Sequence, residues 1–257
     1  MFLQERQEKI LEYVNQHETA TTKELSRLFQ ISLVTTRSDI NELDRKGLLL
    51  KTHGGAMSLL GKMDFETPFL VKNAINMEAK KKIGEAAAAL IADNDVVILD
   101  SGTTTLQIAL ALQKTNITAI TNDLKIATIL AEKGISLVMP GGTVMSSVYA
   151  LVGTQTVDFF RNIHANKLFL GVDAVDLKAG ITNRKLMDIG VKNSMIGASE
   201  QIIAVCDHSK VGKRVFAKLC DTDQLDIFIT DWLEPDEQKQ LEEAGVKPIV
   251  TDNNEGV

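Results

Sequence analysis

Residues 96–105 constrain the fold more than any other stretch, because a strand pattern, a glycine turn and a helix start meet there. The unbroken apolar run Val96–Leu99 predicts a buried strand ending at Asp100, and the periodic apolar residues after Thr105 predict a helix. At such a corner the amides of the first helical turn point outward and the helix dipole adds partial positive charge, so a phosphate can bind there. The alternative is an ordinary turn whose Ser and Thr side chains only cap the helix.

Strand-like and helix-like segments alternate throughout the region that contains this corner. A helix at 77–91 opens the region, further strands are expected at 117–121, 135–139, 167–171, 201–206 and 225–230, and helices are expected at 124–132, 186–198 and 235–244. This alternation predicts an α/β fold with a largely parallel sheet and right-handed crossovers.

Polar residues and glycines follow the predicted strands, and ligands collect at the carboxyl ends of the strands in such sheets. Each could have a structural role alone: Asp173 as a helix cap, Lys210 as a surface charge and the glycine pair as a turn. Together they offer a phosphate cradle, hydroxyl-binding groups and a cation, which suits a small polyol phosphate. The candidates are Asp100, Ser101, Gly102, Thr103, Thr104, Thr105, Asn122, Gly141, Gly142, Asp173 and Lys210.

Residues 1–57 show a different pattern, typical of three short helices and a ribbon. The first helix is expected at 5–16, and a capping box formed by Thr21 and Glu24 predicts the start of the second. The third begins after Ser32 as N-cap and ends at Gly47, and an extended ribbon follows at 48–56. The side chains expected to face the core are Leu25, Leu28 and Phe29 in the second helix and Thr36, Ile40 and Leu43 in the third.

Three helices followed by a ribbon indicate a winged helix-turn-helix, whose third helix enters the DNA major groove. Val34, Arg37, Ser38 and Asn41 lie away from the buried stripe of that helix, and Lys51 and His53 lie on the predicted wing, near phosphates or the minor groove. A small protein-interaction module is the alternative, because residues 1–57 hold eight basic and eight acidic residues. The rest of the chain carries the whole net charge of −6.

Composition excludes several other classes. No apolar run approaches the roughly 20 residues of a membrane span, and the polar start at 1–9 lacks the apolar core of a signal peptide. We therefore expect a cytoplasmic protein. Cys206 and Cys220 fit no disulfide or metal framework and are expected to be buried thiols, and the four histidines lack ligand spacing, so we expect neither a metal nor a cofactor.

The string SLVTTRSDINEL at 32–43, followed by HGGA at 53–56, resembles the DNA-binding signature of the DeoR family of bacterial transcriptional regulators. The usual form there is S-x-x-T-I-R-R-D-L with a downstream H-G-G-A. Thr36 departs from it by replacing a buried aliphatic residue, and Ser38 by replacing the second arginine. The resemblance adds Ser32 and Thr35 to the residues expected at DNA.

A second set of motifs resembles, in order, those of the DeoR-family sensor domain: LDSGTTT at 99–105, TN at 121–122, GG at 141–142, GVD at 171–173, GIT at 180–182 and DHSKVG at 207–212. This resemblance implies a fold related to ribose-5-phosphate isomerase and a phosphorylated sugar as effector, and it adds Thr182 to the effector site. The segments NRK at 183–185 and DIGVK at 188–192 depart from the family pattern, in which a glutamate followed by alanine is common in the latter.

We therefore expect a winged helix-turn-helix domain at 3–58, a linker at 59–76 and an α/β sensor domain at 77–257. The predicted function is a DNA-binding repressor of a carbohydrate operon, controlled by a sugar phosphate. An isomerase-like enzyme is the alternative, although isomerisation needs a base and the set above contains no obvious glutamate. A protein-interaction adaptor is a third possibility. A homodimer or higher homo-oligomer is expected, because a helix-turn-helix monomer buries little DNA surface.

Overall fold

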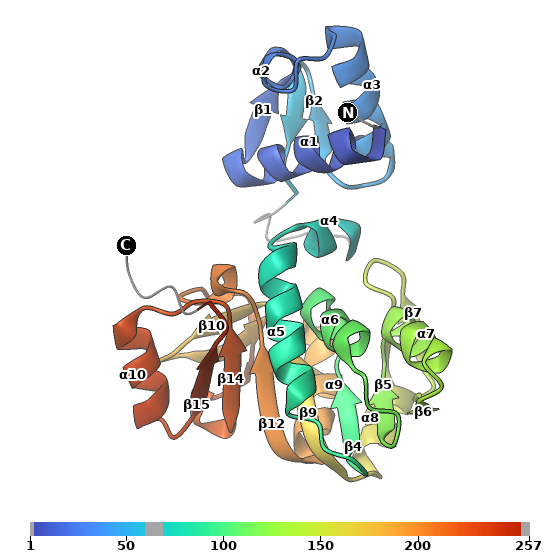
Figure 1. Ribbon diagram of the computed structural model, residues 1–257, viewed down its shortest axis with the longest axis vertical. Coiled ribbons are helices and arrows are strands. Elements are labelled where there is room, and N and C mark those ends of the chain that lie inside the picture. Colours follow the sequence, from blue (N-terminus) through green and yellow to red (C-terminus); the bar gives the residue numbers. More distant parts are fainter. Residues whose placement is uncertain (1–2, 60–68, 253–257) are drawn as a thin grey trace. The chain divides into compact units, whose positions relative to one another are not determined.

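The computed structural model describes residues 3–59 and 69–252 of the chain (Figure 1). They form two compact units, divided between Ile75 and Asn76. Among the described residues, no helix is both long enough and apolar enough to cross a membrane.

The first unit is a winged helix-turn-helix, as predicted. Its elements are α1 (Leu3–His17), β1 (Thr19–Thr21), α2 (Thr22–Leu28), α3 (Leu33–Arg45), β2 (Leu50–Thr52), β3 (Gly55–Met57) and α4 (Phe69–Ala74). The three strands form an antiparallel sheet in the order β1-β3-β2. Strand β1 was not predicted; it pairs Ala20 with Ala56 and so ties the start of α2 to the wing.

Local capping explains where the helices of this unit begin. Thr21 and Glu24 form the predicted capping box, and the Ser32 side chain accepts a hydrogen bond from the amide of Thr35. The predicted stripe of α3 is buried. The prediction for Leu28 is wrong, because its side chain is 51% exposed. Helix α2 ends at this residue, and Phe29 at the C-cap packs against the core instead.

The second unit contains the predicted parallel α/β fold. Its elements are α5 (Met77–Ala89), β4 (Val96–Leu99), α6 (Thr103–Ala111), β5 (Thr118–Thr121), α7 (Leu124–Glu132), β6 (Ser136–Val138), β7 (Thr143–Met145), β8 (Ala150–Val152), α8 (Thr154–Arg161), β9 (Ala165–Gly171), β10 (Ala174–Asp176), β11 (Gly180–Asn183), α9 (Leu186–Gly197), β12 (Ser199–Val205), the 3-10 helix η1 (His208–Lys210), β13 (Ala217–Cys220), the 3-10 helix η2 (Thr222–Gln224), β14 (Ile227–Thr230), α10 (Pro235–Glu243) and β15 (Lys247–Val250).

The main sheet has the strand order β15-β14-β12-β9-β4-β5-β6, and all of its pairings are parallel. A three-stranded antiparallel sheet, β10-β11-β13, and the two-stranded β7-β8 accompany it. The central strands bury Ile98, Phe169 and Phe228 completely, as expected for strands covered on both faces. Helices α5 and α6 pack so closely that a Cβ on Gly84 would lie 2.6 Å from the Cβ of Gln107.

The predicted linker 59–76 lies partly outside the described residues, which omit 60–68. Its described part is not an irregular linker, because it contains α4, and Ala74 and Ile75 pack against the core of the first unit. Both cysteines are buried, as expected, and burial raises the pKa of the Cys220 thiol to about 11.

Candidate nucleic-acid interface and effector site

Helix α3 and the wing together form a shallow pocket of about 330 Å³ on the first unit. Arg37 and Asn41 reach it from α3, and Lys51 and His53 reach it from the wing. All four side chains are exposed. Four of the residues predicted to bind DNA therefore converge on one surface, which offers two cations, an amide and an imidazole.

The other four predicted residues have a different arrangement and do not line this pocket. Ser32 caps α3: its hydroxyl accepts from the Thr35 amide at 3.0 Å and lies 2.8 Å from the Thr35 hydroxyl. Val34 is 75% exposed and Ser38 is exposed as well. These four residues thus contribute one apolar and three hydroxyl side chains at and near the start of α3.

Polar contacts hold α3 and the wing in place. Asp39 on the buried side of α3 accepts two hydrogen bonds from the Arg6 guanidinium of α1, at 2.6 and 3.0 Å. Such a bidentate pair fixes the orientation of the Arg6 guanidinium relative to the Asp39 carboxylate as well as the distance between them. The amide of Lys51 donates to the Asp44 carboxylate at 2.8 Å, which ties the wing to the end of α3. These contacts therefore join both elements that line the pocket to their neighbours.

In the second unit, Asp100 at the end of β4 is fully buried and forms an ion pair with Lys192 of α9. The same carboxylate oxygen accepts from the Gly171 amide at 3.0 Å, and the Lys192 ammonium also donates to the Gly171 carbonyl at 2.8 Å. Burial raises the pKa of the Asp100 carboxyl, and Lys192 and the Gly171 amide oppose that rise. This arrangement joins the ends of β4 and β9 to α9.

The first turn of α6 follows directly, and its hydroxyls divide into two kinds. Ser101 donates to the buried Asp123 at 2.7 Å, and Thr105 donates to the Gly102 carbonyl at 3.0 Å. The hydroxyls of Thr103 and Thr104 make no hydrogen bond to any described residue. Gly102 occupies the N-cap and supplies no side-chain cap, so the amides of the first turn are not satisfied in that way.

Two buried amide side chains follow or end strands of the second unit. Asn122 follows β5 and donates to the Leu151 carbonyl at 3.1 Å, while its Oδ1 atom has no partner among the described residues. Asn183 at the end of β11 also has a buried Oδ1 atom without a described partner. Its neighbour Arg184 donates its amide to Asp173 at 3.2 Å. Buried acceptors without donors are uncommon in folded proteins.

Several predicted effector residues already serve the fold. A Cβ on Gly142 would lie 2.3 Å from the Thr156 hydroxyl, and that hydroxyl donates to the Gly141 carbonyl at 2.8 Å. Close approach to α8 thus explains Gly142, and Gly141 contributes its carbonyl to the same contact. The Thr182 hydroxyl accepts from the Val215 amide at 3.0 Å, so it joins a loop to β11.

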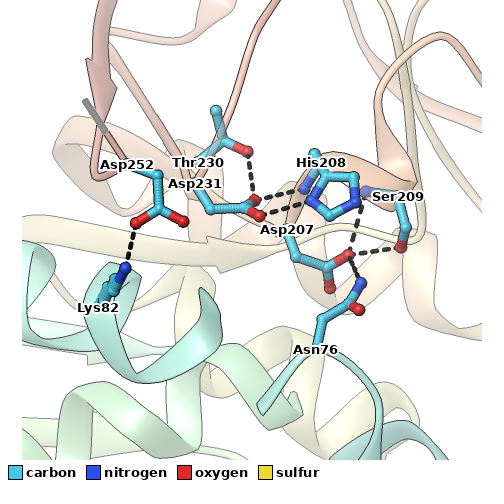
Figure 2. Close-up of polar contacts among 8 residues, drawn as sticks. All are labelled: Asn76, Lys82, Asp207, His208, Ser209, Thr230, Asp231 and Asp252. Atoms are coloured by element: carbon cyan, nitrogen blue, oxygen red, sulfur yellow. Dashed lines mark hydrogen bonds and ion pairs between the residues drawn. The ribbon is translucent and has the colours of Figure 1, made fainter. Parts of the chain in front are cut away.

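Lys210 is the last residue of η1, shortly after β12. Its neighbours Asp207, His208 and Ser209 form a network of polar contacts (Figure 2). Asp207 caps η1 and accepts from the Ser209 amide at 3.1 Å and from Asn76 at 2.7 Å. Burial alone would raise the pKa of Asp207, but the Ser209 hydrogen bond and the charges of Lys210 and Lys80 hold it below its ordinary value. His208 contacts Asp231 through its amide at 2.6 Å and its ring at 2.5 Å.

The structure therefore brings the 100–105 corner into contact with Asp123, Gly171 and Lys192, and places Lys210 at the end of a nearby strand. Lys192 was not among the predicted site residues, because a lysine within a helix gives no local sign that it pairs with a buried carboxylate. Its position beside Val191 and Met195, both buried, was the signal that could have identified it. Among residues 3–59 and 69–252, no group of His, Cys, Asp or Glu side chains is arranged to hold a metal.

A winged helix-turn-helix joined to an α/β unit with an open helix N-terminus at its sheet edge defines a DNA-binding protein with a candidate ligand site. Two family models match this chain: a DeoR-like helix-turn-helix domain at 6–60 and a DeoR C-terminal sensor domain at 75–232. The chain belongs to the DeoR family of transcriptional regulators, as its motifs predicted.

Named relatives agree with this assignment. A putative aga operon transcriptional repressor of Escherichia coli O157:H7 is 34% identical, over 96% of this chain and 93% of that protein. The HTH-type transcriptional repressor GlcR of Bacillus subtilis is 33% identical over 100% of this chain and 99% of its own length. The glycerol-3-phosphate regulon repressor of Escherichia coli K12 is 29% identical, over 88% and 90%. These relatives are regulators rather than enzymes, as was predicted for this chain.

A solved structure of ribose 5-phosphate isomerase A from Methanocaldococcus jannaschii is also similar, over 53% of this chain and 55% of that chain. The identity is 16% and the TM-score is 0.40, so nothing about activity follows from this likeness.

Proposed function

We propose that this regulator represses a carbohydrate operon by binding operator DNA through α3 and the wing, and that a phosphorylated sugar bound at the carboxyl edge of the main sheet controls it. The observation that carries the effector proposal is the first turn of α6. It combines an uncapped helix N-terminus with two unengaged hydroxyls, on Thr103 and Thr104. The buried Oδ1 of Asn122 has no partner in the part of the chain that the structure describes, which is an independent sign of a missing donor, such as a sugar hydroxyl.

The DNA-binding proposal rests on the pocket of the first unit. Arg37 is suited to a guanine edge and Asn41 to an adenine edge, because both side chains can form paired hydrogen bonds. Lys51 and His53 lie across the pocket from α3 and are suited to phosphate contacts. Ser32, Val34, Thr35 and Ser38 contribute the start of the helix that enters the groove. A homodimer on a pseudo-palindromic operator completes this proposal.

The effector proposal assigns the phosphate to the amides and hydroxyls at 102–104, where the helix dipole favours an anion. The carboxylate of Asp100 behind this turn would repel a phosphate, but the Lys192 ammonium compensates its charge. Asp173, Asn122 and Lys210 supply groups for sugar hydroxyls and for additional charge. Ser101, Thr105, Gly141, Gly142 and Thr182 shape the site from behind. Relatives named as repressors of a glycerol-3-phosphate regulon and an aga operon support this class of ligand.

The DNA-binding part is tested by comparing two arginines of the same helix. Replacement of Arg37 by alanine should weaken operator binding by roughly 1–3 kcal/mol if the side chain reads a base. Arg45→Ala is the matched control, since Arg45 lies in the last turn of α3 and pairs with Glu42 at 2.7 Å. Fluorescence anisotropy with promoter DNA measures both variants. Equal affinity of Arg37→Ala and the wild type would remove Arg37 from the interface.

The effector part is tested with Thr104→Asp, which places a carboxylate where the phosphate is proposed to bind. This variant should lose affinity for sugar phosphates by at least about tenfold, because like charges compete for one helix N-terminus. Lys210→Ala should weaken binding by roughly 10- to 100-fold, the effect of one charge-assisted hydrogen bond. Calorimetric titration with pentose, hexose and triose phosphates measures both. Wild-type affinity in both variants would rule out this site.

A further inference from the structure

Asn76 is the first residue of the second unit, and its backbone is left-handed, with φ 51° and ψ 39°. It occupies the N-cap of α5, yet its side chain makes no capping hydrogen bond to that helix. The side-chain amide instead donates to Asp207 at 2.7 Å, as Figure 2 shows. The residue at which the DNA-binding unit joins the sensor unit is therefore held by a residue at the end of β12.

Asp207 belongs to the same turn as Lys210. Its carbonyl accepts from the Lys210 amide at 3.0 Å, and its side chain accepts from both the amide and the hydroxyl of Ser209. The charges of Lys210 and of Lys80, a buried residue of α5, both act on the Asp207 carboxylate. Asp207 therefore faces a cation of the proposed effector site and a cation of the junction helix at the same time.

The rest of this turn is fixed, which limits how it can respond. His208 is held by Asp231 through its amide and its ring. The amide of Asp252 donates to the Asp231 carbonyl at 3.0 Å, and Asp252 pairs with Lys82 of α5. Contacts to the segment after β14 thus hold the backbone of η1 in place. The hydrogen bonds and charges around the Asp207 carboxylate, in contrast, can become stronger or weaker relative to one another.

We propose that Asp207 is a positioning residue that links the effector site to the junction helix. The proposal rests on the assignment of Lys210 to the effector site. A phosphate dianion that draws the Lys210 ammonium removes a cation from the surroundings of Asp207. A buried carboxylate needs its remaining donors more strongly when one cation leaves. Asp207 then accepts more strongly from Asn76 and is attracted more strongly by the charge of Lys80, and the first turn of α5, directly after the DNA-binding unit, becomes more rigid.

Hydrogen exchange followed by mass spectrometry tests this on the full chain. The probes are D-ribose 5-phosphate, D-glucose 6-phosphate, D-fructose 6-phosphate and glycerol 3-phosphate. In the wild type, the sugar phosphate that binds should slow exchange at two places: the effector turn at 100–106 and the first turn of α5 at 76–81. The amide of Lys80, which donates to the Asn76 carbonyl at 3.0 Å, reports on the second place.

Three variants separate positioning from ordinary stability. Asn76→Gly removes the side-chain amide and keeps a residue that adopts the left-handed conformation readily. It should retain protection at 100–106 and lose the ligand-dependent change at 76–81. Lys82→Met removes the other polar anchor of the same helix and should retain both responses. Asp207→Asn keeps a carbonyl oxygen for Asn76 but removes the charge, and it should also lose the response at 76–81.

The outcomes distinguish this inference from the proposed function. Protection at 100–106 with no change at 76–81 in the wild type would overturn the inference and leave the effector site in place. An unchanged response at 76–81 in both Asn76→Gly and Asp207→Asn would also overturn it. Absence of protection at 100–106 with every probe would remove the proposed effector site, and the inference with it.

Discussion

Replacement of Lys192 by methionine should destabilise the second unit strongly at neutral pH and weakly in acid. Lys192 is 7% exposed and Asp100 is 1% exposed, so the ion pair between them is almost completely enclosed. Methionine fills a similar volume without the ammonium group. Among the described residues, the backbone amides of Gly171 and Ser101 then remain as hydrogen-bond donors to the Asp100 carboxylate.

The expected cost follows from the burial of the remaining charge. Removing one partner of a buried ion pair typically costs roughly 3–5 kcal/mol. Lys192 also donates to the Gly171 carbonyl, and losing such a hydrogen bond adds about 1 kcal/mol. Whole domains are stable by only about 5–15 kcal/mol. The variant should therefore fold, but with a large fraction of its stability lost at neutral pH.

The pH dependence gives the sharper test. Burial already raises the pKa of Asp100, and Lys192 opposes this, so its removal raises that pKa further. A carboxyl group with a raised folded-state pKa costs nothing below its unfolded pKa, where it is protonated in both states. The cost grows as the pH rises from that value to the folded-state pKa. The stability difference between variant and wild type should thus be small near pH 4 and complete near pH 8.

Urea unfolding measured at several pH values provides the assay. Trp232 is the one tryptophan of the chain and lies in the second unit, so its fluorescence follows that unit alone. The double variant Asp100→Asn with Lys192→Met is the control and should recover most of the loss, because a neutral replacement of both partners leaves no buried charge. A stability difference that is the same at pH 4 and pH 8 would refute this account of the pair.

Three further substitutions test other parts of the structure. Arg6→Met should destabilise the first unit by roughly 1.5–3 kcal/mol, because it leaves the buried Asp39 without its charged donor; an unchanged unfolding transition by circular dichroism would contradict this. Gly142→Ala should destabilise the second unit by roughly 1–3 kcal/mol, since the new Cβ would overlap the Thr156 hydroxyl; thermal unfolding measures the loss, and a wild-type melting temperature would argue against the close contact. Asp176 has a pKa lowered to about 2, chiefly by Arg214, so it stabilises the fold above pH 3.8 and loses that effect as the pH falls towards 2. Asp176→Asn should therefore show a smaller drop in melting temperature between pH 5 and pH 2.5, and a drop equal to that of the wild type would count against this.

Short-range signals allowed much of the fold to be predicted from the sequence. The capping box at Thr21 and Glu24 and the N-cap at Ser32 depend on residues three positions apart, and both are present. The predicted parallel strands are mostly apolar, and most of them match the observed strands within one or two residues. Fully buried strands and capped helices therefore carry their own signature.

Short peripheral strands carry no such signature. Strand β1 has three residues and forms only because the wing strand β3 lies beside it. Strand β11 pairs with β13, which lies more than thirty residues further along the chain. The register of this pairing shifts between Ile181 and Thr182. Three or four residues are too few for a period to appear, and the partner strand lies far along the sequence. Such pairings are decided by tertiary contacts rather than by local pattern.

In the candidate effector site, too, only some of the residues could be located from the sequence: the carboxylates could, and the cations could not. Its carboxylates Asp100 and Asp207 directly follow apolar strands, so the sequence pattern locates them at the sheet edge. The cations that compensate them lie in helices, Lys192 in the middle of α9 and Lys80 in the first turn of α5, where a hydrophobic period assigns lysine to solvent. Each is buried only because a carboxylate from a distant segment lies nearby. A buried lysine without such a partner would lose its charge or leave the core. The sequence therefore identifies where an anion can bind, whereas the neutralisation that makes such binding possible becomes visible only when the strand ends and the helices are brought together.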